Sequence, residues 1–471
     1  MQNKRETLGS RLGFILISAG CAIGIGNVWR FPWLAGRYGG GWFVVAYLAF
    51  LVLLGLPVMT MEFAMGRAAG RSPALIYQSL GRPGWRWHGA ASFAGCVLLM
   101  SYYTTVAGWM FTYFALSVRG SFAGMDSAAV GAKFGTVLAD PAMQLVPMAL
   151  VVAAGFAVCA AGLRGGLERV TKWMMLALLA LMAVLAAHSV LLERTSAAVA
   201  EDGSVAVRGA MDGVRYFLVP DSSSVAAHGG WPKVVAEAMN QAFFTLSLGI
   251  GAMAIFGSYI GRDRALLGES VRVTVFDTIV ALCAGLIVIP ACFAYGVEPG
   301  AGPGLLFATL PNVFAGMSAG RLWGSLFFVF MSFAAFSTVL AVFENILACA
   351  MDWTGWSRRR ASAVCASGVF ALSVPCALGW SVLAGFHPLG ADSGVLDLED
   401  FVVSNLLLPG GAFVYVLFCT RRFGWGWEGF ASEANAGRGA KVKRWMRFYC
   451  TWILPVVVLA ILGIGLRDAI G

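Results

Sequence analysis

Eleven long apolar runs constrain this chain more than any other feature of its sequence. Each run is long enough to cross the hydrocarbon core of a bilayer, which takes about 20 apolar residues. Lipid offers no hydrogen-bond partner to backbone N–H and C=O groups, so a spanning run must fold as a helix. The runs cover residues 12–37, 42–69, 89–119, 142–162, 167–192, 233–257, 269–296, 321–352, 361–386, 399–420 and 447–466. The sequence therefore predicts an all-α polytopic membrane protein.

The overall composition favours the same class and excludes several others. The chain has 471 residues, of which 59% are hydrophobic and 12% are charged, a balance foreign to soluble domains. Its net charge of +9 comes from basic clusters between apolar runs, which is typical of membrane loops and not of a nucleic-acid partner. Ten scattered cysteines without a C-x-x-C pair, and four dispersed histidines, predict no cofactor and no metal cluster. No nucleophile or metal constellation indicates a membrane-embedded enzyme.

The distribution of Lys and Arg predicts how the chain is organised across the membrane. Most of the 33 basic residues face one side if the N-terminus is cytoplasmic, and eleven spans then place the C-terminus outside. The expected parts are a cytoplasmic segment 1–11, a five-helix unit 12–192, an extracellular loop 193–232, a second five-helix unit 233–420, a cytoplasmic loop 421–446 and an eleventh span with the C-terminus, 447–471. The composition of the 193–232 loop predicts a plain linker. The apolar stretch that follows V-E-P-G-A-G-P-G, before span 8, is expected to form a short helical hairpin.

The first span carries glycines where a membrane helix should be continuous. Residues 18–32 read S-A-G-C-A-I-G-I-G-N-V-W-R-F-P, with three glycines within seven residues. Glycine weakens a helix, and unwound backbone at membrane depth is tolerated only where it lines a cavity. Transporters build substrate and cation sites from such discontinuous helices. The alternative is a continuous helix whose glycines allow close packing, but Asn27 and Arg30 favour a functional break because polar groups at depth are costly.

A second glycine-interrupted segment lies five spans later. Residues 245–251 of span 6 read T-L-S-L-G-I-G and echo the A-I-G-I-G of span 1. Matching interruptions in two halves of a chain are typical of an inverted repeat. We therefore expect spans 1–5 and 6–10 to form an inverted five-helix repeat with discontinuous spans 1 and 6, followed by an eleventh span.

Five ionisable residues, Arg30, Glu62, Asp277, Glu344 and Asp400, fall in or near the spans, and each is a candidate for function. Glu62 is expected to accept the freed N–H groups of the unwound segments, which is a structural role. Glu344 has the alternative of being solvated at an inner vestibule. Asp277 has no basic residue within reach on its own helix, so it requires a cation, and sodium favours oxygen ligands by analogy with other hard cations.

Two pairs of charges are candidates for gates. Arg30 and Asp400 are both expected near the outer ends of their spans, and Arg5 and Asp352 near the inner face. Exposed ion pairs contribute little stability, which suits a gate that must open. The alternative for each pair is two unrelated interfacial charges.

The motifs taken together resemble those of the neurotransmitter:sodium symporter family. The resemblance rests on G-I-G-N-V-W-R-F-P in span 1, G-G-G-W-F at 39–43, N-Q-A-F-F-T-L-S-L-G-I-G at 240–251, F-S-T at 336–338 and L-D-L-E-D at 396–400. It covers nearly the whole chain, and the eleven-span count is similar to that of bacterial amino-acid transporters in the family. It implies an inverted-repeat fold, alternating access and sodium-driven uptake of amino acids or related amines, here across a bacterial inner (plasma) membrane.

The resemblance also implies site residues. The substrate set is Ala22, Ile25, Gly26, Leu99, Tyr103, Phe244, Thr245, Ser247, Ile250, Thr338 and Val342. One sodium ion would be bound by Ala22, Asn27, Thr245, Asp277 and the substrate carboxylate. A second would be bound by Gly20, Ile23, Ala334, Ser337 and Thr338. Gln241 would lie beside the Arg30–Asp400 gate, and Ser258 and Tyr259 near the inner gate. Sodium ions are expected as co-transported ligands, and the chain as a monomer or weak homodimer in the lipid bilayer.

Four positions refine these expectations. Gly24 stands where monoamine carriers of the family have aspartate, so a carboxylate supplied by the substrate fits, and an amino acid is expected. Asp277 stands where chloride-dependent members have asparagine, and Ala281 offers no anion ligand, so chloride independence is expected. Cys21 replaces an asparagine found in some bacterial relatives. The apolar pocket with one hydroxyl favours a neutral, hydrophobic L-amino acid, without separating leucine from methionine or an aromatic.

Two other functions remain open at this point. A proton-coupled amino-acid carrier on the same fold would use Asp277, Glu62 or Glu344, if one of these carboxylates titrates when desolvated. A sensor that binds amino acids without transporting them would keep the same binding residues. The Ser337–Thr338 pair favours sodium at the second site.

Overall fold

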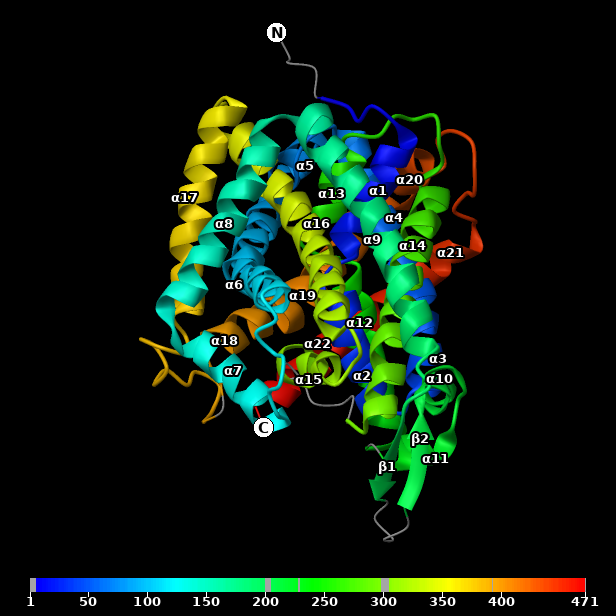
Figure 1. Cartoon of the computed structure of the whole chain (residues 1–471). Coiled ribbons are helices and arrows are strands. Elements are labelled where there is room, and N and C mark those ends of the chain that lie inside the picture. The colour runs from blue at the N-terminus through cyan, green and yellow to red at the C-terminus, as the bar shows by residue number, and fades with distance from the viewer. Residues whose placement is uncertain (1–5, 200–204, 228, 298–304, 392, 471) are drawn as a thin grey trace.

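A bundle of long helices forms almost the entire protein in the computed structural model, which describes residues 6–199, 205–227, 229–297, 305–391 and 393–470 (Figure 1). The two longest helices, α6 (Arg86–Val118) and α16 (Gly320–Thr354), pack against each other through the centre. Nine helices of the described chain, and one bent pair, are long and apolar enough to span a membrane. The all-α membrane fold is thus confirmed.

The first five-helix unit begins with a bent span. Helix α1 (Arg11–Ala22) is followed by a π-helical turn (Gly26–Arg30) and α2 (Phe31–Arg37), with a 56° bend between the halves. The other members are α3 (Gly41–Phe50) continued through Leu51–Gly55 into α4 (Leu56–Ala69), then α6, α8 (Pro141–Ala160), and Leu163–Glu168 continued into α9 (Arg169–Val190). Shorter connecting helices are α5 (Pro73–Ser79), Pro83–Trp85 and α7 (Ser127–Ala139).

The second unit begins with a broken span. Helix α12 (Gly230–Thr245) and α13 (Ala252–Gly257) are separated by residues 246–251. The others are α14 (Leu266–Tyr295), α16, α17 (Arg358–Ala377), and α18 (Val395–Phe401) continued through Val402–Leu407 into α19 (Leu408–Thr420). The last span runs through α21 (Trp445–Phe448), Tyr449–Ile453 and α22 (Leu454–Ile470). The broken sixth span does not meet the length criterion in the described chain, so the count of eleven stays a prediction.

The 193–232 segment is not the plain linker that its composition predicts. Strands β1 (Thr195–Val199) and β2 (Val205–Gly209) pair antiparallel, and α10 (Ala210–Leu218) and α11 (Ser222–Ala227) follow. Phe217 of α10 is fully buried against Gly285 of α14, where a Cβ would leave no room for its ring. One buried aromatic side chain therefore anchors the segment to the bundle.

Two further connections differ in detail from the sequence reading. The described part of the expected hairpin before span 8 is a short helix, Leu305–Thr309 continued into α15 (Leu310–Ala315), whose Phe307 stacks on Phe134 of α7. Residues 298–304 lie outside the described chain. The ninth span ends at Ala377 and not at residue 386, and Gly379 follows within two residues. Between spans 10 and 11, α20 (Gly426–Ala434) supplies Glu433, whose Oε1 lies 2.7 Å from Nε of the buried Arg67.

Candidate functional site

The break in span 1 frees a backbone amide near the middle of the protein. Helix α1 ends at Ala22, and Ile23 has an extended backbone, with φ −73° and ψ 95°. The amide of Ile25 donates to the hydroxyl of Tyr103 on α6 at 2.9 Å. No Cβ would fit at Gly24, because it would fall 2.4 Å from the Tyr103 hydroxyl. The break is thus held by a side chain from another span.

The break in span 6 depends on positive φ angles and on a buried carboxylate. Ser247 has a φ of 50° and Gly249 a φ of 100°, in a region that favours glycine. The amide of Gly249 donates to Oε1 of Glu62 at 2.6 Å, and Glu62 is fully buried. Glu62 therefore lies against the unwound backbone of span 6, as its predicted structural role requires.

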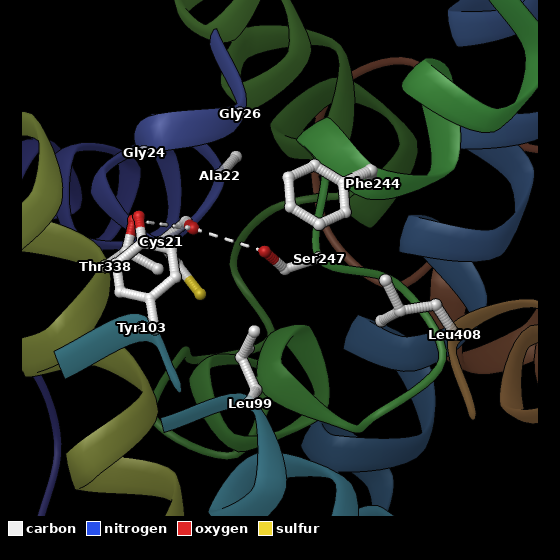
Figure 2. A pocket seen from close by; sticks show the side chains of 10 residues that line it. All are labelled: Cys21, Ala22, Gly24, Gly26, Leu99, Tyr103, Phe244, Ser247, Thr338 and Leu408. Carbon is white, nitrogen blue, oxygen red and sulfur yellow. Dashed lines mark hydrogen bonds between the residues drawn. The ribbon is translucent and has the colours of Figure 1, made fainter. Parts of the chain in front are cut away.

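A small cavity of about 20 Å³ lies between the two breaks (Figure 2). Its lining consists of Cys21, Ala22, Gly24, Gly26, Leu99, Tyr103, Phe244, Ser247, Thr338 and Leu408. The cavity is only large enough for about one water molecule. Seven residues of the expected substrate set thus meet here from spans 1, 3, 6 and 8.

Four members of the expected substrate set do not line the cavity. Ile250 follows the turn at Ser247–Gly249, which directs its side chain toward Gly95 and away from the cavity. Val342 is one helical turn beyond Thr338 on α16 and does not line the cavity, and neither does Thr245. Ile25 contributes its backbone amide and not its side chain.

Leu408 is the lining residue that sequence reasoning missed on span 10. It begins α19, directly after the π-helical segment Val402–Leu407 and directly before Pro409. The run L-L-L-P-G-G at 406–411 was the available signal, because a proline and paired glycines inside a span mark irregular backbone.

On the side of the expected outer gate, Phe244 covers the cavity. The guanidinium of Arg30 lies 4.6 Å from the centre of its ring, a cation–π distance, and Gln241 Nε2 donates to the carbonyl of Gly26 at 2.9 Å. Asp400 accepts instead from the hydroxyls of Tyr102 at 2.9 Å and Ser404 at 2.7 Å. No ion pair joins Arg30 and Asp400 in the described residues, because each has a nearer partner. The residues of the expected outer gate therefore form two separate clusters, one around Arg30 and one around Asp400.

A buried carboxylate cluster lies beside the break in span 1. Asp277 is fully buried, and one of its oxygens accepts from Asn27 Nδ2 at 2.8 Å. The Thr245 hydroxyl lies 3.3 Å from both carboxylate oxygens, and Tyr47 donates to Oδ2 at 3.3 Å. The cluster brings together three side chains of the expected first sodium site, Asn27, Thr245 and Asp277.

The oxygens of the expected second sodium site also converge. The Ser337 hydroxyl lies 3.2 Å from the carbonyl of Ile23, and it donates to the carbonyl of Ala334 at 2.9 Å. The Thr338 hydroxyl lies 3.3 Å from the carbonyls of both Gly20 and Ile23. Unwinding after Ala22 turns these carbonyls toward α16, so backbone and hydroxyl oxygens face one point.

An ion-pair cluster lies at the position of the expected inner gate. Glu344 is fully buried and not solvated at a vestibule, since Arg358 Nη1 lies 2.8 Å from its Oε2 and the Tyr259 hydroxyl donates to its Oε1 at 2.8 Å. Sequence reasoning missed Arg358, which begins α17, fourteen positions after Glu344.

The other inner-gate residues take local partners. Asp352 accepts from the amide of Ser72 at 2.8 Å and lies 3.5 Å from Arg71, while its expected partner Arg5 lies outside the described residues. Ser258 donates to the carbonyl of Ile255 within its own turn, at 2.6 Å.

The donor atoms of this site fit hard monovalent cations and a small zwitterion. Hydroxyl, carbonyl and carboxylate oxygens dominate both clusters, and such oxygens are the ligands of hard cations. Within the described chain, no three His, Cys, Asp or Glu side chains gather as a metal site. The cavity between the clusters is mostly apolar, with the Tyr103, Ser247 and Thr338 hydroxyls as its polar edge.

Comparisons with known proteins agree with this geometry. A family model described as the sodium:neurotransmitter symporter family matches residues 5–128 and 132–469. The sodium-dependent transporter YhdH of Bacillus subtilis is 32% identical over 462 residues, covering 98% of this chain and 97% of the relative. A sodium-dependent transporter of Haemophilus influenzae is 26% identical over 97% of each chain. The crystal structure of MhsT in complex with L-phenylalanine superposes with a TM-score of 0.84 at 32% identity, covering 97% of this chain and 99% of MhsT.

Proposed function

The chain belongs to the sodium:neurotransmitter symporter family and is a sodium-coupled membrane transporter, and we propose that it imports neutral, hydrophobic L-amino acids by alternating access without chloride. One observation carries the substrate class. At the break in span 1, the Tyr103 hydroxyl and the Ile25 amide meet at the start of a half-helix, beside an apolar cavity. The positive end of a helix and a hydroxyl donor suit a carboxylate, and the apolar wall suits a hydrophobic side chain.

The amino-acid zwitterion would lie across the two breaks. Its carboxylate would bind the amides near Ile25 and Gly26 and the Tyr103 hydroxyl. Its ammonium group would donate to carbonyls of the span 6 break, at Phe244, Thr245 and Ser247. The similar protein MhsT forms a complex with L-phenylalanine, which supports a carboxylate-bearing apolar substrate.

Binding requires movement of the cavity wall. A cavity of about 20 Å³ has room for little more than a water molecule, so wall residues such as Phe244 and Leu408 would move apart to admit a hydrophobic side chain. Phe244 is partly exposed beneath Arg30, whereas on the inner side Glu344 is fully buried and its partner Arg358 is only partly exposed. Outward opening would therefore begin at Phe244, and inward opening would require the Glu344–Arg358 ion pair to move.

Two sodium ions would accompany the substrate. The first would be bound by Asn27, Thr245 and Asp277, with the Ala22 carbonyl and the substrate carboxylate. The second would be bound by the carbonyls of Gly20, Ile23 and Ala334 with the Ser337 and Thr338 hydroxyls. Binding of the first ion by the substrate carboxylate would couple the two binding events.

The proposal that transport does not need chloride is supported by the position of Asp277. Its carboxylate contacts Asn27, Thr245 and Tyr47, all of them neutral, so it supplies a fixed negative charge beside the first sodium site. A second anion near this carboxylate would be repelled, and the fully buried Ala281 on the next turn of α14 offers it no ligand.

Uptake into proteoliposomes tests this function. The purified protein would receive labelled L-phenylalanine with sodium or potassium outside, each with chloride or gluconate. The proposal expects uptake that requires sodium and is the same in chloride and in gluconate. Labelled L-glutamate and L-lysine are the charged controls and should not be transported. Uptake driven by a pH gradient without sodium would favour the proton-coupled carrier, and sodium-dependent binding without uptake would favour a sensor. The cytoplasmic N-terminus, the inner-membrane location and the monomer or weak homodimer stay predictions.

A further inference from the structure

A second cavity, about ten times larger than the central one, lies between spans 3 and 10. Its volume is about 210 Å³, and its lining is Trp87, His88, Ala91, Ser92, Gly249, Ile250, Leu406, Leu407, Gly410, Gly411 and Val414. We call it the span 3–span 10 groove. Residues of α6 form one wall at helical spacing, and residues of span 10 form the other.

The groove opens toward the hydrocarbon region and not toward water. Trp87 is 55% exposed, and Leu406, Leu407, Gly410 and Val414 are partly exposed on spanning segments. Exposed surface at this depth contacts acyl chains. An apolar cavity holds no ordered water, because water needs two to four polar partners. The natural occupant of such a groove is a hydrocarbon chain.

The mouth of the groove carries positive charge. Trp85, just before α6, stacks on Phe423, just after α19, with ring centres 5.9 Å apart. This contact brings Arg82 and Arg86 to the same end of the groove as Arg422. All three arginines are exposed, and none makes a side-chain hydrogen bond or ion pair within the described residues. Such arginines at a membrane interface attract anionic lipid headgroups.

The floor of the groove lies next to the central cavity, because neighbouring residues of spans 6 and 10 line the two spaces. Gly249 and Ile250 of the span 6 break line the groove, and the backbones of Gly249 and Gly411 touch so closely that neither tolerates a Cβ. Leu408, within one turn of Gly411, lines the central cavity. A chain in the groove would thus press on the backbone contact that positions Leu408.

We propose that the span 3–span 10 groove binds one acyl chain of an anionic phospholipid, whose phosphate lies at Arg82, Arg86 and Arg422. The bound chain holds span 10 against the broken part of span 6, so the transport rate depends on this lipid. Lipid binding stands independently of the transported substrate, whereas the effect on rate rests on the proposed function.

Photo-crosslinking tests the binding directly. The purified protein would be placed in nanodiscs that contain phosphatidylglycerol or phosphatidylcholine with a diazirine on the acyl chain. After illumination, mass spectrometry would locate the label. The proposal expects labelling of peptides 87–92 and 406–414 that is stronger with phosphatidylglycerol, whereas span 11 is labelled equally by both lipids.

Gly410→Phe tests the groove itself, because a Cβ at Gly410 meets nothing within 4 Å and the new ring would fill the space. Labelling at the groove should fall by about tenfold, the loss expected when two methylene groups are no longer buried. The matched control is Gly368→Phe on span 9, another exposed glycine with no neighbour within 4 Å. Unchanged labelling of span 11 would show that both variants are folded.

The headgroup is tested by the double change Arg82→Gln and Arg86→Gln. The preference for phosphatidylglycerol should fall by about thirtyfold, as expected from the removal of two interfacial arginines. Arg169→Gln with Arg359→Gln is the control, since both are exposed arginines at other span ends without side-chain partners in the described chain. Equal labelling by the two lipids in the parent, or unchanged labelling in Gly410→Phe, would overturn the proposal.

Discussion

Gly24→Ala tests whether the break in span 1 is packed as tightly as the site requires. A Cβ at this position would fall 2.4 Å from the Tyr103 hydroxyl and 2.5 Å from the Thr338 hydroxyl. Neither group can yield easily, because the tyrosine ring is rigid and bonded to the Ile25 amide, and the threonine side chain is short. One methyl group would therefore disturb the carboxylate site and the second sodium site together.

The magnitude follows from two terms. Overpacking costs about 1–3 kcal/mol, and loss of the hydrogen bond between Ile25 and Tyr103 costs about 0.5–1.5 kcal/mol. At about 1.4 kcal/mol for each factor of ten, the sum predicts that substrate affinity falls by about tenfold to a thousandfold. The half-saturating sodium concentration should rise in the same variant.

Equilibrium binding of labelled L-phenylalanine in sodium measures the effect. Gly463→Ala on span 11 is the control, since its Cβ meets nothing within 4 Å. In a double-mutant cycle, Tyr103→Phe removes the hydroxyl that the new methyl group meets, so the combined loss should be smaller than the sum of the single losses. The packing argument would be wrong if Gly24→Ala bound L-phenylalanine as tightly as the Gly463→Ala control. It would also be wrong if the affinity losses of Gly24→Ala and Tyr103→Phe were strictly additive.

Three further changes test other parts of the site. Asp277→Asn removes the fixed negative charge, and uptake assays should show either new chloride dependence or loss of activity; unchanged chloride-free uptake would contradict the assignment. Thr338→Val keeps the shape but removes a sodium ligand, so the sodium concentration for half-maximal uptake should rise by about tenfold or more, which a sodium titration measures. Glu62→Gln replaces one carboxylate oxygen at the span 6 break with an NH₂ group that cannot accept from a freed backbone amide, so it should destabilise the protein by about 1–2 kcal/mol, seen as a lower unfolding temperature; an unchanged temperature would argue against its structural role.

The membrane-spanning helices and the two helix breaks were predictable because they depend on local composition. Apolar runs specify membrane helices, and the glycines near Gly24 and Gly249 mark both breaks, since only unwound backbone needs them at depth. The convergence of Asp277 with Asn27 and Thr245 came from the family resemblance. Sequence spacing alone does not bring spans 1, 6 and 7 together.

Features that depend on tertiary packing were not predictable. The partner of Glu344 is Arg358, and choosing it over other arginines needs the relative positions of α16 and α17. Arg30 and Asp400 are both near the outer side, but their side chains lie against Phe244 and Tyr102 and not against each other. Rotamers and helix rotation decide such contacts, and no pattern of residues encodes them locally.

Substrate-stimulated sodium entry is the decisive measurement for coupling between the two oxygen clusters and the transported amino acid. Proteoliposomes would receive isotopically labelled sodium, with and without external L-phenylalanine, while uptake of labelled L-phenylalanine is measured in parallel. We predict that the amino acid accelerates sodium entry, and that Thr338→Val lowers the sodium flux and the L-phenylalanine flux together. Entry of L-phenylalanine without any additional sodium entry would contradict sodium coupling at these two clusters.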